Sequence, residues 1–338
     1  MHFVQEASIM VSCNLTEPLI REVLREIGGP TGSWETTVRE LLNQSFPSLS
    51  TGPAEFAAAY LRYNLIRKYS GDVPVDTDPE GVALRSFLEA EERCAEWNRH
   101  RGLEFDRTLD AGYPATQSLE ALFWRAKEKI RDVLGRFDLD EAAELVRYTG
   151  GASTRLTRST GHPYFKYQGR PEVTPACAML AICDLWRMPI LRERMQERSW
   201  DPNKWVQTVR GSELAFVPKT WKTHRTICLE PEGNMRWQCA IGTMIRRRFK
   251  NNTGGACAFG RWRTQDLSDQ QPNARLAEIG SYTNGLATID LSAASDSISM
   301  ALVEELLPAD WLRFIHMTRS PMCWLPDGRW HRLAKVSS

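Results

Sequence analysis

The sequence predicts an α+β fold, and two observations support this prediction. Apolar residues recur at the three- and four-residue spacing of amphipathic helices through the first half of the chain. After about residue 211, short apolar stretches bounded by turn-forming residues predict strands. With 338 residues, of which 42% are hydrophobic, the chain can bury a large core and corresponds to roughly two domains of ordinary size.

The first predicted helix has one apolar face. Thr16 is a candidate N-cap, and the Gly-Gly-Pro run at 28–30 stops the pattern. The apolar positions of this helix are Leu19, Ile20, Val23, Leu24 and Ile27.

A long amphipathic helix is predicted to begin at Asp78 and Pro79, because Pro is favoured in the first helical turn. Its solvent-exposed side is expected to carry most of the charge. The residues expected on the apolar side are Val82, Phe87, Leu88, Cys94 and Trp97, and those expected on the exposed side are Glu89, Glu91, Glu92 and Arg93.

Three further helices are predicted before the texture of the sequence changes. They lie at 118–135, 139–148 and 175–187. Gly150, Gly151 and Pro189 interrupt the helical pattern between or after them.

The charge of the whole chain gives no general attraction to nucleic acid, membranes or acidic substrates. Lys and Arg total 43 against 42 Asp and Glu, so the formal charge is +1. The eight cysteines are dispersed without a C-x-x-C pair, which argues against a structural zinc site or a disulfide framework. We expect no export signal and no membrane span, since neither a basic leader nor an apolar run of about eighteen residues is present. Any site for an anion must therefore be local.

Two predicted strands enclose a basic turn. LAFVP at 214–218 forms the first strand, which Pro218 ends, and RTICLEP at 225–231 forms the second. Lys219, Lys222 and Arg225 follow Pro218 at intervals of three. Cations at this density repel one another unless an anion binds, and a triphosphate suits the point charge of Lys and the planar fork of Arg. The alternative is a solvated basic turn.

Two further groups of cations could contact RNA. A helix predicted within 233–250 ends in Arg246, Arg247 and Arg248, and its apolar face is expected to comprise Met235, Cys239, Ile245 and Phe249. The segment 150–169 combines Arg155 and Arg158 with aromatic residues, a mixture suited to phosphate contact and base stacking. The alternatives are that the first group only complements a helix dipole and that the second is a loop followed by an edge strand.

Two aspartates flank the end of a predicted strand. In GLATIDLSAASDSIS (285–299), Asp290 would end a buried strand, and Ser292 or Ser295 would cap a helix with one apolar face. A carboxylate at a strand end suits Mg²⁺, which prefers oxygen ligands. Asp296, six positions later, could return to the same cleft and contact a ribose hydroxyl. The alternative is that Asp296 complements the helix dipole and Asp290 forms a turn. The apolar face of the helix would comprise Ile298, Leu302 and Leu306.

These motifs resemble those of the replicases of levivirus-type single-stranded RNA bacteriophages. DLSAASDSIS (290–299) is similar to the first palm motif of these right-hand polymerases, which use two magnesium ions, and VPKTWKTHR (217–225) is similar to their basic fingers motif. The resemblance implies that Asp290 binds Mg²⁺ and Asp296 contacts the ribose of the incoming nucleotide. It also implies that Lys219, Lys222 and Arg225 contact the phosphates of that nucleotide.

The final residues, LAKVSS, imply an incomplete palm. In the replicases a similar Lys-x-Ser-Ser stretch leads into a Gly-rich motif and a Tyr-Gly-Asp-Asp turn, and the sequence contains neither of these motifs. We therefore expect a right-hand polymerase with fingers and part of the palm, truncated before the palm is complete and inactive alone. The expected regions are a helical N-terminal region at 1–150, a fingers-like region with the basic hairpin at 151–280 and the start of the palm at 281–338.

The expected function is RNA-directed RNA polymerase activity that replicates a single-stranded RNA phage genome by magnesium-dependent nucleotidyl transfer. Its substrates would be an RNA template and nucleoside triphosphates. The resemblance also implies host translation elongation factors and a ribosomal protein as partners, no membrane, and a place in the bacterial cytoplasm. One alternative is a non-catalytic RNA-binding or assembly protein related to the replicase. Another is a metal-dependent nuclease that uses Asp290 and Asp296.

Overall fold

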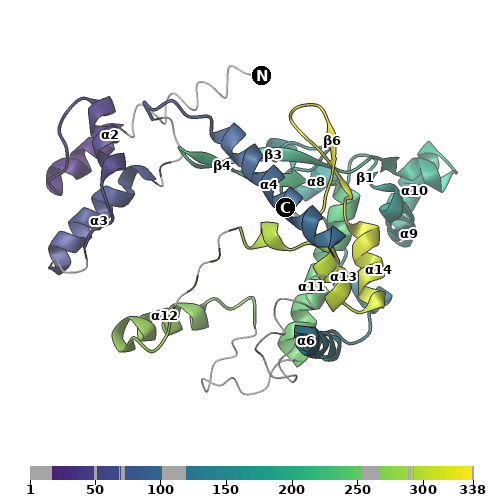
Figure 1. Ribbon diagram of the computed structural model, residues 1–338. Coiled ribbons are helices and arrows are strands. Elements are labelled where there is room, and N and C mark those ends of the chain that lie inside the picture. Colours follow the sequence, from purple (N-terminus) through teal and green to yellow (C-terminus); the bar gives the residue numbers. More distant parts are fainter. Residues whose placement is uncertain are drawn as a thin grey trace. The chain divides into compact units, whose positions relative to one another are not determined.

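The computed structural model describes residues 17–48, 52–67, Tyr69, 73–100, 119–252, 266–287, Ile289, Leu291 and 293–336 (Figure 1). The chain divides into two compact units. The first unit contains the chain up to Leu88 together with Ala215–Ile227, and the second contains Glu89–Leu214 and Cys228–Ser338. The predicted boundaries at 150 and 280 stay predictions.

The first unit consists mainly of helices around a small apolar core. Residues 17–26 are helical and are followed by Gly28 at φ +69°, so the first predicted helix is confirmed. Its predicted apolar face is wrong at Leu19, which is 65% exposed, and its predicted cap, Thr16, lies outside the described residues. The helix α2 (Trp34–Asn43) begins at Ser33, whose Oγ accepts a hydrogen bond from the Thr36 amide at 3.2 Å, and α3 (Pro53–Arg67) follows it. The core comprises Ile20, Leu24, Val38, Leu41 and Ile66.

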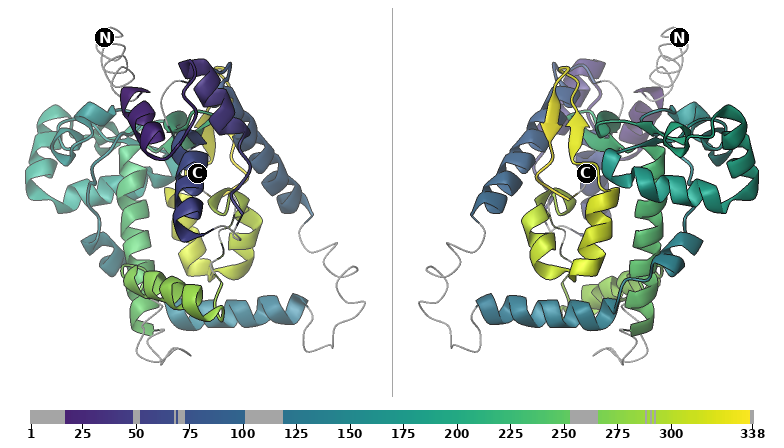
Figure 2. Two further views of the ribbon diagram at one scale, coloured as in Figure 1. Left: turned by 90° about the vertical axis from the view of Figure 1, so that its left-hand side faces the viewer. Right: turned by 90° about the vertical axis from the view of Figure 1, so that its right-hand side faces the viewer.

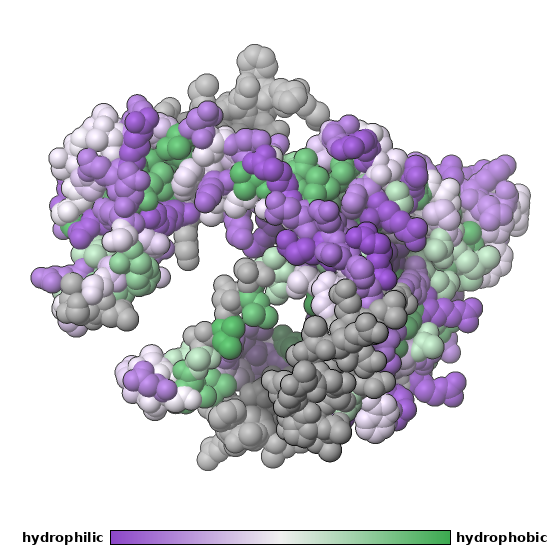
Figure 3. Space-filling view, viewed as in Figure 1, coloured by the Kyte–Doolittle hydropathy of each residue, from purple (hydrophilic) through white to green (hydrophobic). Residues whose placement is uncertain are grey.

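The helix α4 (Pro79–Arg99) starts where the sequence predicts, because Asp78 Oδ1 accepts a hydrogen bond from the Gly81 amide at 2.8 Å. Glu89, Glu92 and Arg93 are exposed, and hydrophilic surface covers this part of the molecule in Figure 3. The prediction for Trp97 on the apolar side is wrong, since this residue is 52% exposed, and the prediction for Glu91 is wrong, since Glu91 is only 1% exposed. It lies four residues after Phe87 and three before Cys94, so helical periodicity places it on the buried face.

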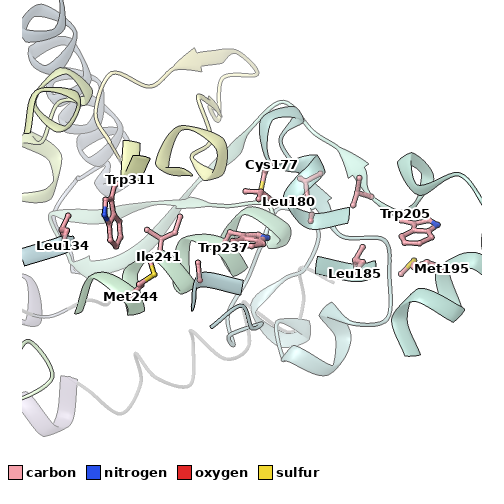
Figure 4. Packing of buried hydrophobic residues seen from close by; sticks show 14 residues of the cluster. Leu134, Cys177, Leu180, Leu185, Met195, Trp205, Trp237, Ile241, Met244 and Trp311 are labelled. Carbon is pink, nitrogen blue, oxygen red and sulfur yellow. The ribbon is translucent and has the colours of Figure 1, made fainter. Parts of the chain in front are cut away.

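The second unit is organised around α11 (Glu232–Asn252), which packs against α6, α7, α9, α14 and β1 (Figures 1 and 2). Trp237, Ile241 and Met244 on α11 join Trp311 of α14 in the core (Figure 4). The predicted apolar face of this helix is displaced, since Met235, Cys239, Ile245 and Phe249 are only partly buried. The other helices among the described residues of the second unit are α6 (Leu119–Leu134), α7 (Leu139–Glu144), α8 (Pro163–Lys166), α9 (Ala178–Arg187), α10 (Pro189–Arg198), α12 (Gln271–Thr283), α13 (Met300–Leu306) and α14 (Ala309–Thr318). Its 3₁₀ turns are η2 (Arg158–Thr160), η3 (Pro175–Cys177), η4 (Pro202–Trp205) and η5 (Ser295–Ser297).

Two small sheets accompany these helices. β1 (Glu172–Val173) pairs in parallel with β2 (Gln207–Thr208). The second sheet has the order β4-β3-β5-β6, with β3 (Ser212–Thr220) parallel to β5 (Met322–Trp324) and β5 antiparallel to β6 (Trp330–Arg332). β4 (Thr223–Leu229) returns beside β3. Gly211 allows the approach of β3 to β5, because a Cβ at this position would lie 1.9 Å from the Met322 carbonyl oxygen.

The α+β fold is confirmed, and several local predictions are corrected. The helix predicted at 139–148 ends at Glu144. Pro189, predicted to interrupt the helical pattern, is the first residue of α10, because Pro fits the first turn of a helix. The segment 150–169 contains η2 and α8 and no strand, so the edge strand considered there is wrong. Pro218 does not end β3, which continues to Thr220. β5 ends at Trp324, which pairs with Glu213, so beyond Glu213 one edge of β3 has no pairing with β5. Proline lacks the amide hydrogen that such pairing needs and is tolerated at a free edge.

The buried strand predicted before Asp290 is not formed by the residues that are described there. Residues 285–287 and Ile289 have no strand structure, and Ile289 is 81% exposed. A strand needs a neighbour for its backbone hydrogen bonds, and within the described ranges no strand pairs with this segment. The cap of α13 is Ser299, whose Oγ accepts the hydrogen bond from the Leu302 amide at 3.2 Å, so the prediction for Ser295 is wrong. Ser292, the other predicted cap, lies outside the described residues.

Candidate functional site

Asp296 forms an ion pair with Lys335. The Lys335 Nζ atom lies 2.6 Å from Asp296 Oδ1, and the Lys335 side chain is completely buried whereas that of Asp296 is 32% exposed. Asp296 belongs to η5, which follows Ala293 at φ +52°, a left-handed conformation that is unusual for a residue with a Cβ. The carboxylate is thus held from the interior and remains partly open on its other side.

A short antiparallel bridge brings these two distant residues together. Ser299 pairs with Lys335, the Met300 amide donates to the Ala334 carbonyl at 2.9 Å, and the Val336 amide donates to the Ile298 carbonyl at 3.0 Å. The segment after Asp296 and the segment around Lys335 therefore lie side by side.

One face of α4 binds both segments. The Cys94 thiol donates to the Asp296 carbonyl at 3.4 Å, and Glu91 Oε2 accepts from the Ala334 amide at 2.6 Å. Asn98 binds twice, donating to the Ala334 carbonyl at 2.9 Å and accepting from the Ala301 amide at 2.9 Å. Burial, followed by the nearby Glu91 charge, raises the pKa of Cys94. Because the positions 91, 94 and 98 have helical spacing, they lie on one face of α4, and this face fixes both segments.

Arg319 holds the same C-terminal segment from another direction. Its guanidinium donates to the carbonyls of Leu333 at 2.8 Å, Lys335 at 2.6 Å and Val336 at 3.1 Å. Burial lowers the pKa of Arg319, although the carboxylates of Glu91 and Glu230 oppose this shift. Three carbonyl acceptors on one planar side chain fix the backbone around Lys335.

The hairpin places the three predicted phosphate-binding residues on exposed positions of the first unit. Lys219 lies in β3, Lys222 in the two-residue turn and Arg225 in β4. The turn is anchored by Trp221, whose amide donates to the Tyr69 carbonyl at 2.6 Å and whose carbonyl accepts from Thr77 Oγ1 at 3.4 Å.

These three cations stay available at the surface. In the part of the chain that the structure describes, none of them forms an ion pair. The neighbouring His224 lies 3.7 Å from Glu80, and because side chains alternate along a strand, Arg225 points to the opposite face.

The arginines predicted to contact RNA differ in whether they form ion pairs within the protein. Arg155 pairs with the buried Glu232 and donates to the Lys166 carbonyl at 3.4 Å, and Arg248 lies 2.5 Å from Glu141. Arg158, Arg246 and Arg247 are exposed. All five contacts stay predictions, and the three exposed arginines have the freer geometry for binding a phosphate.

Asp290, the predicted magnesium ligand, lies outside the described residues. Among those that are described, no group of three or more His, Cys, Asp or Glu side chains is arranged to hold a metal ion. Asp296 has a cation as its neighbour, which suits a hydrogen-bonding role better than metal coordination. No helix of the described ranges is long and apolar enough to cross a membrane.

The sequence reasoning missed Lys335, Glu91, Asn98 and Arg319 as parts of this site. A signal existed for Glu91, since a carboxylate between Phe87 and Cys94 on an apolar stripe must find a partner in the interior. For Lys335 and Arg319 the partners are backbone atoms and a distant carboxylate, which no local pattern indicates.

Comparison with known proteins shows the family to which the chain belongs. The model of the family described as RNA replicase, beta-chain, matches residues 4–338. The chain is 35% identical over 312 residues to the RNA-directed RNA polymerase subunit beta of Enterobacteria phage SP, covering 89% of this chain and 48% of the relative. It is 36% identical over 293 residues to that of Escherichia virus Qbeta, covering 86% and 45%, and 33% identical over 293 residues to the RNA-directed RNA polymerase beta chain of Enterobacteria phage fr, covering 82% and 48%. The chain spans about half the length of the curated relatives it matches.

Proposed function

Because this chain belongs to the RNA replicase beta-chain family, we propose that it forms the fingers and the first part of the palm of an RNA-directed RNA polymerase. The observation that carries the proposal is the similarity to relatives named as RNA-directed RNA polymerase beta subunits or beta chains, at 33–36% identity over more than four fifths of the chain. The polymerase would copy a single-stranded RNA phage genome from an RNA template and nucleoside triphosphates.

The basic hairpin supports a role in holding the incoming nucleotide. Lys219, Lys222 and Arg225 present exposed positive charge on one short hairpin, which suits the several oxygens of a triphosphate. Fixed cations stabilise the negative charge that accumulates on the phosphates during nucleotidyl transfer without reorganising at the moment of reaction.

The Asp296 site supports a role in recognising the sugar. A carboxylate can accept about four hydrogen bonds, and Lys335 donates one to Asp296 from the interior. The partly exposed side of Asp296 can accept a hydrogen bond from a ribose hydroxyl, which a deoxyribonucleotide lacks at the 2′ position.

Magnesium binding by Asp290 belongs to the same proposal and rests on the resemblance of the 290–299 motif and on the chemistry of a carboxylate, an oxygen ligand that Mg²⁺ prefers. Bound magnesium would supply charge neutralisation at the phosphates. Asp290 alone is one ligand, so the other acids of a two-metal site would have to come from elsewhere in the polymerase. On this proposal the 338-residue chain alone is inactive.

The names of the relatives from phage SP and virus Qbeta include "subunit beta", which indicates that those proteins work in an assembly of more than one subunit. We extend this to the present chain, with host translation elongation factors and a ribosomal protein as partners in the cytoplasm of an infected bacterium.

The direct test is to determine the RNA sequence that follows the codon of Ser338. An open frame that continues into a Gly-rich segment and an Asp-Asp turn, followed by template-dependent incorporation of ribonucleotides by the encoded protein, is the expected result. A stop codon directly after Ser338, with RNA binding but no synthesis, would instead favour the non-catalytic RNA-binding alternative.

A further inference from the structure

The ion pair between Asp296 and Lys335 is asymmetric. The Lys335 side chain has no exposed surface, so its ammonium must form hydrogen bonds with protein atoms in place of water. The Asp296 side chain, in contrast, is 32% exposed. An exposed ion pair holds its members loosely, but here one partner is fixed in the interior. The position of the buried cation thus determines where the open carboxylate points.

The backbone of Lys335 is held on both sides. Its carbonyl accepts from Arg319 Nη2 at 2.6 Å, and the amides of Ala334 and Val336 donate to Glu91 and to the Ile298 carbonyl. A lysine side chain loses rotamer entropy when it is immobilised, so holding it in one conformation requires a backbone that is itself fixed.

The same face of α4 also binds the segment that carries Asp296, the other member of the ion pair. Cys94 donates to the Asp296 carbonyl, while Asn98 links Ala334 to Ala301 at the start of α13. One rigid helix face therefore sets the separation of the two segments that carry the ion pair.

From this arrangement we propose that Lys335 is a positioning residue that selects ribonucleotides by fixing the Asp296 carboxylate toward the 2′-hydroxyl of the incoming nucleotide. The inference rests on the proposed function, in which Asp296 contacts the ribose. Burying the Lys335 ammonium carries a desolvation cost that an apolar side chain of similar size would avoid, so orientation of the Asp296 carboxylate accounts for a lysine at this position.

The test compares ribonucleotide and deoxyribonucleotide incorporation by the full-length polymerase that contains this chain. Lys335→Met removes the charge and keeps the length of the side chain. We expect it to lower the ratio of kcat/KM for the ribonucleotide over the deoxyribonucleotide by about tenfold, mainly through a higher KM for the ribonucleotide. Lys335→Arg, which keeps the charge, should retain most of the discrimination.

Lys166→Met is the matched control. Lys166 is also completely buried and donates to the Thr149 carbonyl at 2.8 Å, but it does not contact Asp296. We expect its discrimination ratio to equal that of the wild type. Equal loss of kcat/KM for both sugars in Lys335→Met, as a damaged fold would give, overturns the inference. If Lys335→Met does not fold, Lys335→Arg decides, and loss of discrimination in this folded variant overturns the inference as well.

Asp296→Asn separates this inference from the function on which it rests. If Lys335 acts through Asp296, the double variant Lys335→Met/Asp296→Asn should discriminate no worse than Asp296→Asn alone. If the losses of discrimination in the two single variants add in the double variant, Lys335 acts independently of Asp296. Normal discrimination in Asp296→Asn would refute the role of Asp296, and a wild-type protein that incorporates no nucleotide would refute the proposed function.

Discussion

Arg155 and Glu232 form an ion pair that crosses from the loop before η2 to the start of α11. The Glu232 side chain is completely buried and also accepts a hydrogen bond from Ser153 Oγ at 3.2 Å, whereas that of Arg155 is 24% exposed. A buried carboxylate that loses its cation keeps the cost of desolvation without compensation. This pair is therefore a structural requirement, whatever Arg155 contributes to RNA binding.

We predict that Arg155→Met lowers the free energy of unfolding by about 3 kcal/mol, because it leaves the Glu232 charge unpaired in the interior. Urea unfolding followed by circular dichroism measures the change. Arg158→Met, three residues away and exposed, is the matched control and should change the free energy by less than about 0.5 kcal/mol. Similar losses in both variants would contradict the assignment.

Glu230 provides a prediction of pH dependence. Burial raises the pKa of this carboxyl above its usual value of 4.5, although hydrogen bonds from Ser320 and Gln238 oppose the shift. A carboxyl with a raised pKa binds its proton more tightly in the folded state, so its contribution to stability is largest at low pH. That contribution is lost as the pH rises from 4.5 through the raised pKa.

Glu230→Gln should therefore remove part of the fall in the free energy of unfolding between pH 4.5 and neutrality. Urea unfolding at a series of pH values measures the difference between the variant and the wild type. Glu193→Gln on the exposed side of α10 is the control and should follow the wild-type pH profile. A constant difference between Glu230→Gln and wild type across this range would disprove the linkage.

At the scale of elements, α13 shows how a cap determines where a helix begins. Ser299 accepts from the Leu302 amide, whereas Ser295 is the first residue of η5 and does not lie at the N-cap of α13. We predict that Ser299→Ala lowers the free energy of unfolding by about 1 kcal/mol and that Ser295→Ala changes it by a few tenths at most. Thermal unfolding of the two variants makes the comparison, and the reverse order would place the cap at Ser295.

The β3–β4 hairpin is the element that the proposed function uses most directly. In the full-length polymerase, Lys222→Ala should raise KM for the nucleotide about tenfold, because one charge-assisted hydrogen bond to a phosphate is lost. Steady-state incorporation at varied nucleotide concentration measures it. Lys204→Ala, which removes an exposed lysine from η4, should leave KM unchanged. An unchanged KM in Lys222→Ala would exclude this lysine from phosphate binding.

At the scale of the whole molecule, the proposed function predicts whether this chain is active by itself. The chain spans about half of its relatives, and Asp290 is the single metal ligand proposed in it. We predict that the 338-residue protein with magnesium, template and nucleotides synthesises no RNA, whereas the protein from an extended reading frame does. Incorporation of labelled nucleotide into acid-insoluble RNA is the measurement, and synthesis by the shorter protein would show that its metal site is complete.

The sequence by itself determined the α+β class, most of the helices, the hairpin and the family. Helical periodicity and turn residues are local signals, and the motif at 290–299 is long enough to identify relatives. Tertiary structure decided that Glu91 accepts a hydrogen bond from the Ala334 amide and that Lys335 meets Asp296. Those contacts join residues far apart in the chain, and a local pattern contains no information about which distant backbone atom or charge a side chain will meet. A strand likewise depends on its partner, which is why the apolar residues before Asp290 predicted a strand that the described residues do not form.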